Sequence, residues 1–476
     1  MAAPSPANPL FAPIAKHRIT PTNPPNEKFS GDLDVDRCAA LHNTLMLYGW
    51  ISCGRPLASL KKASWWSRHG SQSLLKILRP ELVRFLGKIF DVEGHCFFYH
   101  LRGLARPGEM MMLGEVLEDE ELGRGLAGVG GKKEGEEEEG VGGKWRFVVL
   151  YATPVALVSH PAGLVYDQHA HRAILMPTYH HVFDLRDKGL PWQSLETVLS
   201  AYIDMIEAEK VLALHAEVHA ASNGIPGLLP WLAQPYTQSD LTSCLETWQK
   251  LVFAIEKKAD ITRSDDLARL CSRSALDAAN VPKGFAHDLL LHAASSSIWF
   301  IAPGIRLPKV EEFIYQPFAP ICAQYPAETA GMKMPFLFLR CPGEVPAKEA
   351  KFRYPFSTLL SVPCGLYLDA FPNAKNPFED ACRLVLPIRL GGNRYARTSD
   401  FRPIRKTFSD LYQVDINPFV MRHGPKLVGV LENWLGNVES GHWRVNSLGV
   451  EGGLGVWRLA DTREDWWRYQ GAHMYL

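Results

Sequence analysis

Segments with the pattern of strands and segments with the pattern of helices fall in separate runs along this chain, which limits the fold. Aromatic and β-branched residues between turn residues predict strands over 94–103, 109–116 and 144–158. Apolar residues at three- and four-residue spacing predict a long helix over 191–221 and another over 239–258. A doubly wound parallel sheet requires strands and helices to alternate. The sequence therefore predicts an α+β fold with antiparallel strands and segregated helices.

Composition changes along the chain indicate how it is organised. Residues 1–32 are rich in Pro, Asn and Ala, which predicts a flexible, disordered tail because little apolar surface is available for burial. We expect one α+β domain over 33–300. Residues 301–476, where connections become Pro-rich, are expected to form a smaller α+β domain or a continuation of the first. Within the first domain, Gly, Lys and Glu replace apolar residues over 123–143, which predicts an acidic, Gly-rich solvated loop.

Charge and cysteine content exclude several classes of protein. The 476 residues contain 51 Lys plus Arg and 51 Asp plus Glu, so the chain lacks the net charge typical of binding to nucleic acid or to an anionic membrane. The nine cysteines form no Cys-x-x-Cys pair, which favours reduced thiols in the cytosol over a disulfide framework or a zinc ribbon. With no secretory signal and no apolar run of about 20 residues, we expect a soluble, cytoplasmic protein without nucleic-acid or membrane partners. The oligomeric state is not indicated.

A histidine-rich segment is the candidate metal site. On a strand, side chains two residues apart point to the same side, so Asp167, His169 and His171 would project together. A return strand would bring His180 or His181 to the same place. Imidazole and carboxylate ligands suit a divalent metal such as zinc, iron or copper. The alternative is that the histidines decorate a solvated hairpin and that Asp167 hydrogen-bonds a turn.

Further titratable residues fall on the predicted 191–221 helix. His215 and His219 are four residues apart and share one side of it, while Glu209 and Glu217 fall within its apolar stripe. Buried carboxylates act as general acids or bases, or form ion pairs with a neighbouring element. No Gly-x-Ser-x-Gly elbow or catalytic cysteine signature occurs, which disfavours a Ser or Cys hydrolase.

Several short strings resemble fungal proteins that accompany secondary-metabolite gene clusters, including clusters for prenylated indole alkaloids of the notoamide type. These strings are Tyr151-Ala-Thr-Pro154, Ile301-Ala-Pro-Gly-Ile305, and Ala460-Asp-Thr462 followed by Trp466, Trp467 and Tyr469. The resemblance implies an accessory role inside the cell and supplies no catalytic residues to carry over.

Three functional hypotheses follow. The first is a soluble intracellular protein, accessory to fungal alkaloid biosynthesis, that binds a hydrophobic small molecule in its aromatic-rich interior; the 13 tryptophans would line the pocket or fill the core. The second is a metal-dependent enzyme that uses the His-x-His segment. The third is a non-catalytic partner-binding protein whose acidic residues 134–139 contact basic surfaces.

Overall fold

The chain forms two compact units in the computed structural model. Unit 1 comprises Met1–Ala233 and Pro418–Met421, and unit 2 comprises Gln234–Asn417 and Arg422–Leu476, so the chain passes between the units three times. The structure describes residues 9–25, 33–118, 145–158, 160–182, 190–222, 224–261, 269–330, 332–368, 378–414, 416–421 and 423–471. The predicted loop over 123–143, with its acidic residues 134–139, lies outside the described residues.

Unit 1 is built around a five-stranded antiparallel sheet in which neighbouring strands are also consecutive in the sequence. Strand β3 is buried along six of its seven residues, which accounts for its nearly continuous apolar sequence. The strands are β1 (Gly103–Leu104), β2 (Phe147–Ala152), β3 (Pro161–Asp167), β4 (Arg172–Thr178) and β5 (Gln193–Ser194). A separate antiparallel pair is formed by β6 (Val211–Ala213) and β7 (Trp231–Ala233).

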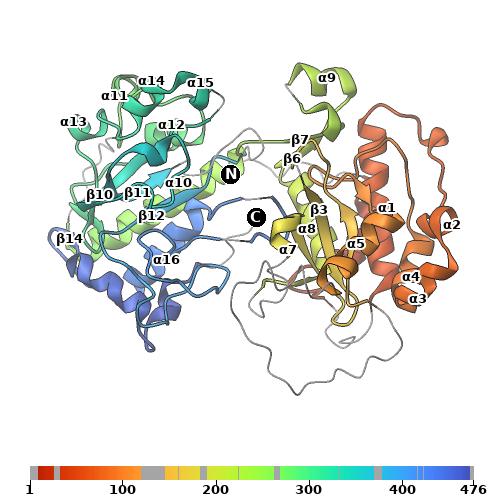
Figure 1. The fold of residues 1–476 in the computed structure, drawn as a ribbon. Helices are drawn as coiled ribbons and strands as arrows, with labels where there is room; N and C mark the ends of the chain where they lie inside the picture. Colours follow the sequence, from red (N-terminus) through yellow and green to blue (C-terminus); the bar gives the residue numbers. More distant parts are fainter. Residues whose placement is uncertain are drawn as a thin grey trace. The chain divides into compact units, whose positions relative to one another are not determined.

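The helices of unit 1 begin at sequence signals that are visible in the chain. Asp34 caps α1 by accepting a hydrogen bond from the Arg37 amide, and Ser194 caps α8 through the Thr197 amide. Figure 1 shows α1 to α4 gathered beside the sheet. The α-helices are α1 (Val35–Ser52), α2 (Trp65–His69), α3 (Gln72–Ile77), α4 (Pro80–Lys88), α5 (Pro107–Glu118), α7 (Tyr179–Val182), α8 (Leu195–Glu207) and α9 (Ala216–Ala221). Short 3-10 turns are η1 (Ala12–His17), η3 (Leu57–Ser59) and η5 (Pro226–Leu228).

Residues 9–25 pack against α1, so the prediction of a flexible tail through residue 32 is wrong for this stretch. Phe11 and Ile14 are buried, and the Phe11 ring centroid lies 5.2 Å from that of Tyr48 on α1. The buried Arg37 guanidinium donates four hydrogen bonds of 2.8–3.2 Å to carbonyl oxygens within residues 17–24. Composition alone missed these contacts because two apolar side chains and one arginine are enough to order the segment.

Unit 2 is built around a seven-stranded sheet with the order β12-β11-β10-β9-β8-β14-β13, in which only the β14–β8 pair is parallel among the described strands. The strands are β8 (Phe300–Ala302), β9 (Ile305–Arg306), β10 (Phe336–Val345), β11 (Val362–Leu368), β12 (Cys382–Val385), β13 (Val445–Asn446) and β14 (Gly449–Val450). Both sheets are thus dominated by antiparallel pairing with the helices outside them, which confirms the α+β fold class.

Helices α10 (Gln238–Lys258) and α16 (Leu427–Glu439) pack against each other in unit 2, and α10 starts at a capping box formed by Thr237 and Asp240. Shorter helices are α11 (Arg273–Ala278), α12 (Phe285–His292), α13 (Val310–Phe313), α14 (Ala319–Gln324) and α15 (Pro326–Thr329). The 3-10 segments are η6 (Phe356–Thr358), η7 (Gly453–Asp461) and η8 (Trp466–Tyr469). No described helix is both long enough and apolar enough to span a bilayer.

The units divide after Ala233 and not near residue 300, where the sequence placed the domain boundary. The difference arises because α10 and α12 contribute apolar residues, including Trp248 and Leu289, to the same core as strands β8 to β12. The Pro-rich connections after residue 298 therefore join elements that share one core.

Three predicted elements are wrong. Residues 94–103, predicted as a strand, form turns with one isolated bridge between Phe98 and Leu101, and only Gly103 belongs to a strand, β1. Residues 109–116, predicted as a strand, lie in α5, where Pro107 occupies the first helical position and the Glu109 carboxylate accepts from the Arg106 amide at 2.8 Å. The predicted 191–221 helix is interrupted: α8 ends at Glu207, Glu209 has a left-handed φ of 59°, and residues 211–213 pair with β7. Strand pairing has overridden a helical pattern in the sequence.

Candidate functional site

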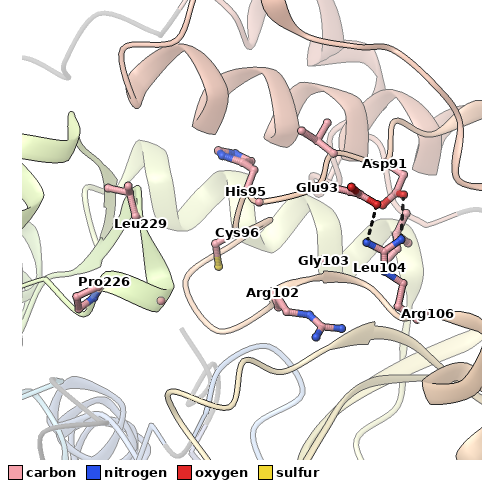
Figure 2. Close-up of a pocket in the computed structure, with 13 residues that line it drawn as sticks. Asp91, Glu93, His95, Cys96, Arg102, Gly103, Leu104, Arg106, Pro226 and Leu229 are labelled. Atoms are coloured by element: carbon pink, nitrogen blue, oxygen red, sulfur yellow. Dashed lines mark hydrogen bonds and ion pairs between the residues drawn. The ribbon is translucent and has the colours of Figure 1, made fainter.

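A cavity of about 400 Å³ in unit 1 is the candidate functional site (Figure 2). Its volume is within the range of small-molecule sites. Three segments form its wall: residues 91–96, which follow α4; residues 102–106, which include β1; and residues 226–229, which include η5. We call it the unit 1 cavity.

Buried hydrogen bonds fix the loop that forms one side of the unit 1 cavity. The Trp231 indole donates to the Cys96 carbonyl at 2.8 Å, and the Cys96 thiol donates toward two carbonyl oxygens, those of Phe98 at 3.1 Å and Leu101 at 3.3 Å. Gly94 has a left-handed φ of 67°, a conformation that a residue with a side chain rarely adopts. The wall is therefore held in shape by the protein itself.

A network of charged groups covers one side of the cavity. Arg106 Nη2 lies 3.2 Å from Glu93 Oε1, and Arg106 Nη1 lies 3.8 Å from Asp91 Oδ2 and 2.5 Å from His69 Nε2. Asp91 Oδ2 is also 3.1 Å from His69 Nε2 and 3.9 Å from Arg68 Nη1. Figure 2 shows Arg106 beside both carboxylates. The two carboxylates are balanced by two guanidinium groups, so this side carries little net charge.

Arg102 provides a second guanidinium group at the cavity. Its Nη2 donates to Glu109 Oε1 at 2.8 Å and to Oε2 at 2.6 Å, and the arginine side chain is 46% exposed. Its Nε and Nη1 donate to no described residue. An arginine held in place by one carboxylate and presenting further N–H groups is suited to binding a carboxylate or phosphate.

The opposite side of the cavity is apolar. Pro226 and Leu229 lie across from the charged network in Figure 2, whereas Leu104 lines the cavity next to Arg106. A Cβ atom added at Gly94 or Gly103 would meet nothing within 4 Å, so bare backbone faces open space there. The cavity therefore has an apolar wall and a charged wall with room between them.

The two most buried titratable residues of the wall, His95 and Cys96, are unsuited to acid–base or nucleophilic chemistry near neutral pH. Burial, reinforced by the charge of Arg55, lowers the pKa of His95 to about 4, so its ring is neutral. Burial raises the pKa of the Cys96 thiol to about 12, so it carries no thiolate nucleophile. The geometry of the cavity supports binding better than it supports catalysis.

The predicted metal residues lie in unit 1, where Asp167 ends β3 and His169 and His171 fall in the turn before β4. The prediction that they share a strand is wrong. Asp167 Oδ1 accepts from the His169 and Ala170 amides at 2.8 and 3.1 Å, and Asp167 Oδ2 lies 3.0 Å from the Arg146 guanidinium. This is the turn alternative considered for Asp167.

The histidine side chains that the structure describes have different surroundings. His169 is exposed, whereas His171 is buried and its Nδ1 lies 2.8 Å from the Tyr166 hydroxyl. His181 Nδ1 lies 2.8 Å from the Thr178 hydroxyl, and the side chain of His180 lies outside the described residues. Among the described side chains, no group of three or more His, Cys, Asp or Glu could hold a metal ion. The divalent-metal hypothesis gains no support from them.

The other candidates from the predicted long helix are also separated. His215 is exposed at the start of α9, while His219 is buried and its Nε2 lies 3.1 Å from the Trp231 carbonyl oxygen. Glu209 and Glu217 are both exposed, so neither is a buried acid. The break in the helix at Glu209 removes the apolar stripe predicted to hold both carboxylates, whereas His215 and His219 remain one turn apart at α9.

Unit 2 contains a buried ion-pair cluster of Asp240, Asp380, His423 and Lys426, whose side chains are at most 10% exposed. His423 Nε2 lies 2.9 Å from Asp380 Oδ1, and Lys426 Nζ lies 3.4 Å from Asp240 and 3.9 Å from Asp380. The cluster joins the start of α10, the segment before β12 and the segment before α16. Since Lys426 faces two carboxylates and His423 contacts one of them, the clearest role of the cluster is to hold these segments together.

Comparisons with protein-family models, with curated proteins and with solved structures find no match for this chain. Function must therefore be argued from the site itself. The sequence reasoning missed the residues of the unit 1 cavity because they form no motif. The one available signal was the density of Asp, Glu, His and Arg between residues 91 and 106, in a region interpreted as a strand.

Proposed function

We propose that this chain is a small-molecule-binding protein whose unit 1 cavity takes an organic acid with an apolar body. The observation that carries the proposal is the placement of Arg102 on the wall of a 400 Å³ cavity whose other side is formed by Pro226 and Leu229. The ligand's carboxylate would accept hydrogen bonds from Arg102, and its apolar part would pack against the two aliphatic residues.

The neighbouring carboxylates support this assignment because other groups already balance them. Glu93 and Asp91 interact with Arg106, and Asp91 also lies next to His69. The charge on Arg102 is shared with Glu109, which is 36% exposed and therefore only partly screens it from a ligand. A ligand carboxylate in the cavity would therefore lie near the Arg102 cation, while the carboxylates of Asp91 and Glu93 already have cationic partners.

A fluorescence titration tests the proposal because two tryptophans contact the cavity wall. Trp231 donates to the Cys96 carbonyl, and the Trp50 ring centroid lies 5.6 Å from that of His95. The probes are monocarboxylic acids of increasing apolar size, from acetate to phenylacetate and decanoate, with the corresponding uncharged amides as controls. We expect saturable changes with the larger acids and weaker changes with the amides.

Two arginine variants decide whether the response comes from this cavity. Loss of a charge-assisted hydrogen bond worth about 1.5–3 kcal/mol predicts that Arg102→Ala weakens binding by roughly 10- to 150-fold. Arg84→Ala is the matched control, because Arg84 is 64% exposed on α4 and pairs only with Glu81 among the described residues. Equal binding by wild type and Arg102→Ala, or tighter binding of the amides, would overturn the proposal.

The sequence resemblance extends the proposal to a biological setting. We propose that the ligand is an acid formed or used in fungal secondary metabolism and that the protein has a cytoplasmic accessory role. Calorimetric titration with indole-containing carboxylic acids tests this extension, since indole fluorescence would obscure the tryptophan signal. Binding of simple acids without binding of any indole acid would leave the cavity assignment intact and remove the alkaloid setting.

A further inference from the structure

A second cavity, in unit 2, has a volume of about 660 Å³ and a different chemical character from the unit 1 cavity. It lies beside α14, between the segment that joins α11 to α12 and the segment that leads into β10. We propose that this cavity binds an uncharged, largely hydrophobic small molecule. The proposal does not depend on the function assigned to unit 1.

Small and flexible side chains create the space. Ala319, Cys322 and Ala323 occupy positions i, i+3 and i+4 of α14 and therefore share one face of that helix. Met332 and Met334 line the cavity where the chain approaches β10. Methionine is unbranched and polarisable, so it adapts to apolar ligands of different shapes. The volume is within the range of small-molecule sites.

The charges around the cavity favour a neutral ligand. Lys333 is the one charged residue among those that line it, and its ammonium group forms an ion pair with the buried Glu379 carboxylate. Glu379 also accepts a hydrogen bond from the Phe285 amide at 2.9 Å, which fixes that carboxylate at the start of α12. An anionic ligand would have to compete with Glu379 for Lys333, whereas an uncharged ligand would leave the pair intact.

Cys322 provides a direct readout of occupancy. It is the one cysteine of nine that is not buried, and all nine are free thiols. Burial still raises the pKa of the Cys322 thiol above its usual value, so alkylation is best measured at mildly alkaline pH. Under native conditions iodoacetamide should modify Cys322 first, and Cys322→Ser should abolish that reaction.

The experiment measures the rate of Cys322 alkylation in the full chain with and without 1-aminoanthracene, a neutral fluorescent probe. With the free probe at about ten times its dissociation constant, we expect alkylation to slow about tenfold. Ala323→Phe should fill the cavity and weaken probe binding. Ala327→Phe, at an exposed position of α15 outside the cavity lining, is the matched control and should bind the probe as wild type does.

Three results would overturn the inference. If Cys322 reacts no faster than the buried cysteines, the cavity is closed to small molecules. If the probe binds without protecting Cys322 and Ala323→Phe keeps full affinity, the ligand site lies elsewhere. If 1-anilinonaphthalene-8-sulfonate, which is anionic, protects Cys322 at lower concentration than the neutral probe, the assigned ligand class is wrong. Arg102→Ala should change none of these measurements, so this proposal and that for unit 1 can fail separately.

Discussion

Replacing Asp461 with asparagine should destabilise unit 2 far more than its small change in shape suggests. The Asp461 carboxylate is buried at the end of η7 and accepts hydrogen bonds from four backbone N–H groups. Oδ2 accepts from the amides of residues 391 and 393 at 3.0 and 2.8 Å, and Oδ1 accepts from those of residues 395 and 396, both at 2.9 Å. In Asp461→Asn an NH₂ group replaces one oxygen and faces two N–H donors.

The structure sets the size of the effect. Whichever oxygen is replaced, two hydrogen bonds to a charged acceptor are lost, each worth about 1.5–3 kcal/mol. The expected loss in the free energy of unfolding is therefore about 3–6 kcal/mol. That is a large fraction of the stability of an ordinary domain. Gly391 adds to the local constraint, because its φ of 89° and the Ile404 carbonyl leave no space for a Cβ atom.

Urea unfolding followed by tryptophan fluorescence measures the change, because Trp434, Trp443 and Trp457 form a packed group in unit 2. Amide hydrogen exchange at residues 391–396 gives a local readout. The control is Asp277→Asn, at an exposed position on α11, which should change stability by less than about 0.5 kcal/mol. A loss below about 1 kcal/mol in Asp461→Asn, with unchanged exchange at residues 391–396, would refute the reasoning.

Two further changes have defined outcomes. Asp380→Asn leaves the buried His423 facing a neutral amide in place of a carboxylate, and we expect unit 2 to lose about 3–5 kcal/mol in urea unfolding; no loss would show that the ion pair contributes nothing. Acidification should destabilise unit 1, because burial lowers the pKa of His42 and His95 to about 4 and that of His100 to about 3. The unfolded chain therefore takes up three protons that the folded unit does not. Between pH 6.5 and about 4, the free energy of unfolding should fall with a maximum slope of about 4 kcal/mol per pH unit, measured by urea unfolding at a series of pH values; a slope unchanged by His100→Leu would contradict this.

Sequence reasoning succeeded where a local signal and the tertiary structure agree. Helix α10 matches the prediction over 239–258 because the apolar spacing runs through that segment and the capping box of Thr237 and Asp240 lies at its start. Residues 191–221 show the opposite case: helical spacing continues through Glu209, but the pairing of β6 with β7 decides the conformation. That pairing joins residues about 20 positions apart and leaves no local sign in either strand.

The candidate site was harder to predict from the sequence than the fold. The unit 1 cavity joins residues 91–96 to residues 226–229, and no spacing within one segment indicates that they meet. The His-x-His segment drew attention because its residue types are those of metal sites, yet its period-two argument required a strand. Asp167 instead accepts hydrogen bonds from two amides in the following turn. The residue types of a metal site were therefore insufficient to predict one, because the backbone does not have the strand conformation that the argument required.

Packing accounts for several of the tryptophans and for one of the strings that carry the resemblance. Trp65, Trp231 and Trp248 are fully buried, and none of them lines the cavities described above. The string Ala460-Asp-Thr462 contains the carboxylate that holds residues 391–396. These residues therefore have structural roles. From the sequence alone they could also be interpreted as part of a ligand pocket or of a family signature.

Unit 1 is discontinuous in the sequence, since Pro418–Met421 belong to it and the Pro418 carbonyl accepts a hydrogen bond from the Leu175 amide of β4 at 3.3 Å. During synthesis, residue 421 leaves the ribosome only after most of unit 2 has been translated. Most of unit 1 is therefore synthesised first, but the unit is complete only when residues 418–421 have been synthesised. A fragment that stops at residue 233 would lack that segment altogether.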